Sequence, residues 1–312
     1  MADEKWITGL RGDMSVAAAA KRVLELRLSA VRDKLPAAVY HADTDVEHVH
    51  HLRVSTRRAA AALRIFVDCL PARVHEKTRK TLRSLRRSAG AARDWDVFLD
   101  MLQARFVRCP AKERIGLVFL FGYARCQREI AQDWLRQAYD AKAEDFAGCI
   151  EDVSAALERK NHAGPTLRDL AGTKLTQLLS ELETAARADL QSYEALHQVR
   201  ILGKQLRYAM EIFESCFASE FRQRYYPEVV EMQDILGLAN DSFTAMQHLN
   251  HLRTRLINAQ PKEWPRLRDG FEKLMQFHEQ RLPHQRRKFE KWWRRWLKSG
   301  GEMAFGELIH AV

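Results

Sequence analysis

The residues best suited to chemistry in this chain are basic side chains that recur on one face of a predicted helix. The segment from Val49 to Phe66 contains no glycine or proline and reads as one amphipathic helix. At about 100° per residue, one stripe of this helix carries only histidine and arginine, namely His50, Arg53, Arg57 and Arg64. Leu52, Leu63 and Phe66 fall on the opposite side and are expected to face a core. A solvated helix normally pairs opposite charges, so a stripe of like charges favours a bound anion.

The same pattern recurs in the second half of the chain, between Leu196 and Phe213. His50 corresponds to His197, an offset of 197 − 50 = 147 residues. The same offset aligns further pairs, namely Arg53 with Arg200, Arg57 with Lys204, Phe66 with Phe213, and residues 90–94 with 237–241. One offset that aligns two separate motifs without a gap indicates an internal duplication, with each copy about half the chain.

The bulk composition sets the class of protein. The chain has 312 residues, a formal net charge of +10 and a pI near 9.5, which favours an anionic partner such as nucleic acid, an anionic membrane surface or another polyanion. Its 5 cysteines are scattered and form no CxxC pair, so neither a zinc site nor a disulfide framework is expected. The N-terminus lacks the pattern of a signal peptide, and the apolar runs are too short to span a bilayer.

The elements that position the basic stripes are predicted to be helices throughout, because strand alternation is missing and β-branched residues are sparse. We therefore expect an all-α fold of two antiparallel four-helix-type bundles related by a pseudo-two-fold. The expected organisation is an N-terminal arm (1–13), a first bundle (14–160), a linker (161–165) and a second bundle with a basic C-terminal helix (166–312).

Local signals predict where several helices begin and end. Pro36 is expected just beyond the end of the first helix, which begins near residue 14. Gly90 and Gly237 are predicted to terminate helices, and Asp94 and Asp241 to cap the helices that follow. These signals divide residues 73–110, and likewise residues 220–258, into two helices each.

The motifs together resemble the CHAD family, the conserved histidine α-helical domain. The resemblance rests on His-x-x-Arg-x-x-x-Arg/Lys in each half, on Gly-x-x-Arg-Asp-x-Asp-Val from Gly90, and on Leu-Gly-x-x-Asn-Asp from Leu236. These four blocks span about residues 14–297 and match the stand-alone form of the family. The resemblance implies that both bundles form one domain around a basic central channel, and that the channel binds inorganic polyphosphate.

The resemblance and the charge pattern together define the predicted binding residues. They are His50, Arg53, Arg57, Arg58, Arg64, Lys80, Arg83, Arg87, His197, Arg200, Lys204 and Arg207. The third helix of the second half lacks the basic run of residues 73–87, so the first half is expected to be the more cationic wall. The two histidines either donate to phosphate or simply satisfy a nearby backbone carbonyl. Metal chelation by them is not favoured, because no carboxylate or cysteine follows at three or four residues.

Three functions remain open from the sequence. The favoured one is non-catalytic binding of polyphosphate by a cytoplasmic protein associated with polyphosphate granules, without metal or cofactor and without a membrane. The alternatives are a single-stranded nucleic-acid binder and a metal-dependent phosphohydrolase. The first alternative draws on Trp292, Trp293 and Trp296 in the basic tail, on which bases could stack. We expect these tryptophans instead to pack the last helix onto the second bundle.

Overall fold

A computed structural model of the chain describes residues 5–159 and 164–310, and these residues are almost entirely helical. The all-α prediction is confirmed. The described helices are α1 (Val16–Tyr40), α2 (Glu47–Ile65), α3 (Ala72–Phe106), α4 (Ala111–Glu158), α5 (Leu167–Ala186), α6 (Tyr193–Phe213), α7 (Tyr226–Ala259), α8 (Trp264–Lys298) and α9 (Gly301–His310). Short 3-10 turns follow α2 and α6, and a π-helical turn (Phe221–Tyr225) leads into α7.

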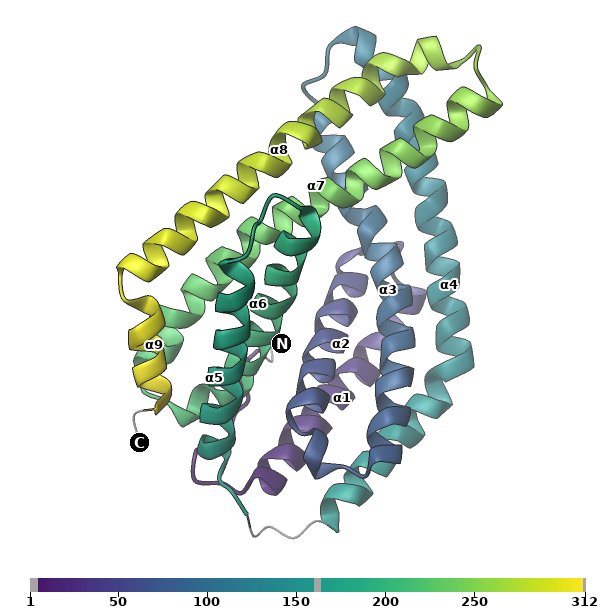
Figure 1. Cartoon of the computed structure of the whole chain (residues 1–312). Helices are drawn as coiled ribbons and strands as arrows, with labels where there is room; N and C mark the ends of the chain where they lie inside the picture. Colours follow the sequence, from purple (N-terminus) through teal and green to yellow (C-terminus); the bar gives the residue numbers. More distant parts are fainter. Residues whose placement is uncertain (1–4, 160–163, 311–312) are drawn as a thin grey trace.

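The helices pack in sequence order. Helices α1 to α4 lie together on one side, and α5 to α9 lie together on the other (Figure 1). The long hairpins α3/α4 and α7/α8 extend beyond the shorter helices and meet at their far ends, where α4 packs against α8. Gly116 of α4 and Gly270 of α8 make this crossing possible, because a Cβ on Gly116 would lie 3.0 Å from the Gly270 Cα.

Two apolar cores hold the arrangement together. The main core is continuous across both halves of the chain and includes Leu24, Leu52, Phe213 and Phe289. A second core forms where the long hairpins meet and includes Phe98, Leu117, Leu249 and Phe271. Leu52, Leu63 and Phe66 are buried, as predicted for the inner face of α2. The stripe of basic residues on α2 is therefore turned away from the main core.

The predicted breaks at Gly90 and Gly237 are wrong, because α3 and α7 run through both glycines without interruption. A Cβ on Gly90 would lie 2.7 Å from Nη1 of Arg53, so this glycine makes room for a guanidinium group from α2. Asp94 and Asp241 consequently lie inside helices and are not N-caps. Asp94 instead forms an ion pair with Arg53 of α2.

The predicted end of α1 at Pro36 is also wrong, since the helix continues to Tyr40. A proline inside a helix removes one backbone hydrogen bond. Ala38 and Val39 beyond it are fully buried in the main core, and their burial offsets that loss. Pro283 lies inside α8 in the same way.

The terminal segments are packed more tightly than the sequence suggested. In the N-terminal arm, Ile7 and Leu10 are buried, and the Trp6 ring contacts Tyr226 with 4.8 Å between ring centroids. The arm thus joins the start of the chain to α7. In the predicted linker, residues 161–163 lie outside the described residues, and Thr166 begins α5 with a capping box to Asp169. At the other end, Trp292, Trp293 and Trp296 are buried, as predicted.

Two further expectations concern cysteines and membranes. Within the described residues the cysteines are free; Cys126 is exposed, and the other four are buried. No described helix is long and apolar enough to cross a membrane.

Candidate functional site

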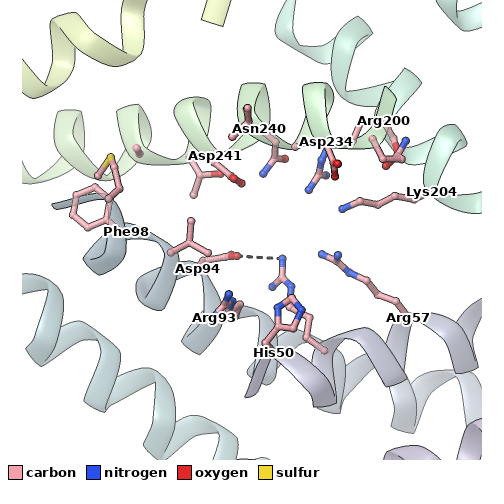
Figure 2. A pocket seen from close by; sticks show the side chains of 18 of the residues that line it. His50, Arg57, Arg93, Asp94, Phe98, Arg200, Lys204, Asp234, Asn240 and Asp241 are labelled. Carbon is pink, nitrogen blue, oxygen red and sulfur yellow. Dashed lines mark hydrogen bonds and ion pairs between the residues drawn. The ribbon is translucent and has the colours of Figure 1, made fainter. Parts of the chain in front are cut away.

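A cavity of about 550 Å³ lies between the α2–α3 and α6–α7 helix pairs. Figure 2 shows α7 and α6 above it and α3 and α2 below it, with polar side chains reaching inward from both sides. The basic residues that line it are His50, Arg53, Arg57, Arg93, Arg200, Lys204, Arg207, His248, His278 and Arg281. The acidic residues that line it are Asp94, Asp234 and Asp241. We call its α2–α3 side the first wall and its α6–α7 side the second wall.

Two cations of the first wall, Arg53 and Arg93, are paired with carboxylates, whereas Arg57 forms no ion pair with a described carboxylate within 4.0 Å. A terminal guanidinium nitrogen of Arg53 lies 3.2 Å from a carboxylate oxygen of Asp94 (Figure 2). Arg93 likewise pairs with Glu47 at 3.2 Å. The Arg53–Asp94 pair links α2 to α3 over the space left by Gly90. These pairs hold the guanidinium groups of Arg53 and Arg93 in place before any ligand arrives.

Cations of the second wall are not paired in this way. None of Arg200, Lys204 and Arg207 forms an ion pair with a described carboxylate within 4.0 Å. Nε of Arg200 and Nε of Arg207 are buried without a hydrogen-bond partner among the described residues. Unused donors in a buried site are costly unless a ligand accepts from them. These two nitrogens of the second wall therefore have donors that a bound anion would satisfy.

Lys204 is the most perturbed cation of the cavity. Burial, and then the charges of Arg57, Arg200, Arg53 and Arg207, lower the pKa of its ammonium group to about 5. Figure 2 shows the Lys204 side chain extended across the cavity toward Arg57. Burial and the neighbouring Arg57 charge also lower the pKa of Arg53 to about 10 and lower that of Arg200. The cavity thus concentrates positive charge that an anion would stabilise.

Six of the predicted binding residues meet at this cavity, namely His50, Arg53, Arg57, Arg200, Lys204 and Arg207. Arg58 does not, because it is buried against the opposite half of the chain, with Nε 2.7 Å from Glu211 of α6. Glu211 also accepts a hydrogen bond of 2.8 Å from the Tyr226 hydroxyl. Arg58 therefore joins α2 to α6 and has no access to the cavity.

The predicted residues of α3 lie on the outer surface. Lys80 is exposed and pairs with Glu76 at 3.5 Å. Arg83 is exposed and, with the exposed Arg64 of α2, lines a separate groove of about 350 Å³ together with His75, Arg79 and Arg86. Arg87 is also exposed. Lys80, Arg83 and Arg87 therefore do not line the cavity, although burial and then the charge of Arg57 lower the pKa of Arg86 on the same helix.

His197 does not line the cavity as His50 does. Its Nδ1 lies 3.0 Å from the Tyr193 hydroxyl, which donates a 3.0 Å hydrogen bond to Asn240. The ring of Tyr193 stacks on Phe243 with 3.4 Å between centroids. The histidine of the second half is thus held by side chains of its own half.

The sequence reasoning missed several lining residues. Asp94 and Asp241 were interpreted as caps, yet both reach the cavity, as does Asn240 (Figure 2). The offset of 241 − 94 = 147 residues that relates the two aspartates was the available signal. The same offset relates Met101 to His248 at the far end of the cavity (248 − 101 = 147), where Phe98 and His278 of the extended hairpins also lie. Within the described residues, no group of three or more His, Cys, Asp or Glu side chains is placed to hold a metal ion.

Comparison with known proteins shows which family and which solved structures the chain is similar to. The family model of the CHAD domain matches residues 22–250 of the chain. The CHAD domain from the plant Ricinus communis superposes with a TM-score of 0.73 and 22% identity, covering 90% of this chain and 92% of that one. PptA from Streptomyces chartreusis superposes with a TM-score of 0.65 and 17% identity, covering 90% and 99%. No curated protein sequence matches the chain. The family match covers most of the chain, and the chain therefore belongs to the CHAD domain family.

Proposed function

We propose that the chain binds inorganic polyphosphate in a basic channel of which this cavity is the central part, and that it does so without catalysis. The observation that carries the proposal is the convergence of Arg53, Arg57, Arg200, Lys204 and Arg207 from two helices on one cavity. The offset of 147 residues that relates the basic stripes of α2 and α6 supports two copies of one unit around that channel.

The chemistry of the cavity suits a repetitive linear anion. Polyphosphate carries charge at every unit and presents only oxygen acceptors along its length. Arginine offers forked donors to neighbouring oxygens, and lysine adds a mobile point charge. The unpartnered donors of Arg200 and Arg207 would gain acceptors from such a chain. A cytoplasmic protein associated with polyphosphate granules is consistent with this ligand.

The test is a binding titration with long-chain polyphosphate at graded salt. We expect the logarithm of the affinity to fall linearly with the logarithm of salt concentration, because binding releases counterions. The double variant Arg57→Ala, Arg200→Ala should weaken binding at every salt concentration. The matched control Arg79→Ala removes a guanidinium group from the outer face of α3 and should leave the affinity within about twofold. Equal losses in both variants would contradict the assignment to the cavity.

Two other functions can be distinguished by parallel tests. A single-stranded nucleic-acid binder would let RNA displace polyphosphate at equal phosphate concentration. Burial of the three tail tryptophans argues against base stacking on α8. A metal-dependent phosphohydrolase would release phosphate from polyphosphate on addition of Mg²⁺ or Mn²⁺.

A further inference from the structure

The cavity is not uniformly cationic along its length. Arg57, Arg200, Lys204 and Arg207 line one end. Asp94, Asp241 and Asn240 follow, and Phe98 lies beyond the two aspartates, as Figure 2 shows from right to left. The same order follows from the helices. Along α3 the lining residues are Asp94, then Phe98, then Met101, and along α7 they are Asp241, then Ala245, then His248.

The apolar end is long enough, measured along α3 and α7, to hold an organic group. Met101 lies 101 − 94 = 7 residues beyond Asp94, and His248 lies 248 − 241 = 7 residues beyond Asp241. At the rise of an α-helix, each span is about 10 Å. The apolar side chains of this end offer an oxyanion no donors in return for its lost water, and the cation that lines the end is Arg281, whose charge lies near His278. Of the two carboxylates at its threshold, Asp94 is paired with Arg53, whereas Asp241 forms no ion pair with a described residue and would repel a phosphate chain.

The polar groups at that end suit an uncharged organic ligand. His278 is 2% exposed, and its Nε2 lies 2.7 Å from the Met101 sulfur. Its Nδ1 is buried without a hydrogen-bond partner among the described residues. Burial lowers the pKa of this imidazole to about 4, so the ring is neutral and Nδ1 can accept a hydrogen bond from an amino group. His248, whose ring stacks on Trp95 at 4.2 Å between centroids, likewise has an unpartnered Nε2.

We infer that the cavity accepts a nucleoside polyphosphate, with phosphates at the cationic end, sugar hydroxyls at Asp94 and Asp241, and the base beside Phe98, Met101 and His278. Carboxylate oxygens accept hydrogen bonds from hydroxyl groups, and aromatic or apolar side chains stack on a base. This inference rests on the proposed function for its cationic end and adds the organic part of the ligand.

The experiment compares adenosine 5′-tetraphosphate with inorganic linear tetraphosphate by calorimetric titration, at equal ionic strength and without divalent metal. The inorganic chain carries the larger charge, because esterification removes one ionisable oxygen. Electrostatics alone would therefore favour the inorganic chain. We expect the nucleotide to bind at least about tenfold more tightly, which corresponds to about 1.4 kcal/mol.

Variants assign that preference to the apolar end. Phe98→Leu and Met101→Ala should each reduce the preference for the nucleotide severalfold and leave the affinity for inorganic tetraphosphate unchanged. Met101 is only partly buried, so its variant tests the inference even where Phe98→Leu disturbs folding. The control Val118→Ala removes an apolar group that is 57% exposed on α4 and should change neither affinity.

The outcomes separate this inference from the proposed function. Nucleotide binding no tighter than that of inorganic tetraphosphate, with polyphosphate still bound, would overturn the inference alone. Nucleotide binding without any binding of polyphosphate would support the inference and overturn the proposed function. A preference that persists in both Phe98→Leu and Met101→Ala would place the base elsewhere and overturn the assignment.

Discussion

Arg53 on α2 and Arg200 on α6 are related by the 147-residue offset, yet only Arg53 has a carboxylate partner among the described residues. Arg53 pairs with Asp94 at 3.2 Å, whereas Nε of Arg200 is buried without a partner in the described part of the chain. Asp241, which corresponds to Asp94, forms no ion pair with a described residue within 4.0 Å. The same sequence pattern therefore produces a paired arginine on α2 and, on α6, an arginine without an ion pair to a described carboxylate.

The expectation that the first half forms the more cationic wall stays a prediction, because the first wall carries three arginines and Asp94, and the second wall carries Arg200, Lys204 and Arg207 together with Asp234 and Asp241. The extra basic residues of the first half, including Lys80 and Arg87, lie on the outer surface of α3. Inside the cavity, Arg57, Arg200, Lys204 and Arg207 form no ion pair with a described carboxylate within 4.0 Å. We therefore expect these side chains to hold most of the electrostatic repulsion that a bound anion relieves.

The largest effect is expected on stability, when the Arg58–Glu211 pair that joins α2 to α6 is broken. Arg58→Ala leaves Glu211 charged and buried between α2 and α6, so we expect a loss of about 3–5 kcal/mol in the free energy of unfolding. Urea unfolding followed by circular dichroism measures the loss. The double variant Arg58→Met, Glu211→Gln should recover most of it, because the new amide oxygen would still accept a hydrogen bond from Tyr226. A single variant as stable as the natural chain would show that this pair does not join the halves.

The next effect distinguishes the walls directly by affinity. Arg200→Ala and Arg207→Ala should each weaken polyphosphate binding by about 1.5–3 kcal/mol, the value of a hydrogen bond to a charged group. Arg53→Ala should cost less, because Arg53 exchanges its bond to Asp94 for the ligand. Titration calorimetry at one salt concentration measures all three. A larger loss at Arg53 than at Arg200 would contradict the different roles proposed for these two arginines.

The lowered pKa of Lys204 predicts that the affinity for polyphosphate depends on pH. Its pKa is about 5 in the free protein, and a bound polyanion raises that pKa toward the ordinary value of about 10.4. Binding therefore takes up a proton between these two values, and the affinity falls as pH rises, by at most about tenfold per pH unit. Titrations at neutral and mildly alkaline pH in buffers of different ionisation enthalpy report this uptake. Lys204→Met should remove it, and an unchanged uptake in this variant would assign the proton to another group.

The lowered pKa of Lys204 also predicts that the stability of the free protein depends on pH, in the opposite direction to the affinity. Because the unfolded chain binds this proton more strongly than the folded chain, the stability of the free protein rises with pH from the folded pKa of about 5 up to the unfolded pKa. Lys204→Met should flatten this rise and increase Tm at neutral pH, while it weakens binding. Thermal unfolding without ligand at several pH values measures the slope. A lower Tm for Lys204→Met at neutral pH would show that Lys204 stabilises the fold.

The smallest effect is expected on the outer surface of the first half. Lys80 is exposed and its partner Glu76 lies on the same helix. Lys80→Ala should therefore change the free energy of unfolding by no more than about 0.5 kcal/mol. It should change the affinity for short-chain polyphosphate by less than about twofold. Fluorescence titration with a short chain checks this value. A loss as large as that of Arg200→Ala would extend the binding site from the cavity to the face of α3.

The apolar pattern of the sequence determined the helical fold and the inner face of α2, because helical periodicity and burial are local properties of consecutive residues. The charge pattern of the sequence also identified one group of basic residues, namely Arg53, Arg57, Arg200, Lys204 and Arg207, since like charges at helical spacing have no partner on their own helix. The helix breaks at Gly90 and Gly237 and the caps at Asp94 and Asp241 were wrong. Glycine and aspartate have the same local signature whether they end a helix or face a neighbouring one.

Only the tertiary structure decided which charges meet. Arg57 and Arg58 are adjacent in sequence, but they differ by about 100° around α2, so Arg57 reaches the cavity and Arg58 reaches Glu211. Likewise, Arg53 is neutralised by Asp94 because α3 passes close to α2 at Gly90, and the corresponding contact of Arg200 with Asp241 is not made. The partners of a buried charge are set by the distances between helices, and these distances depend on the packing of the whole core rather than on any local stretch of the chain.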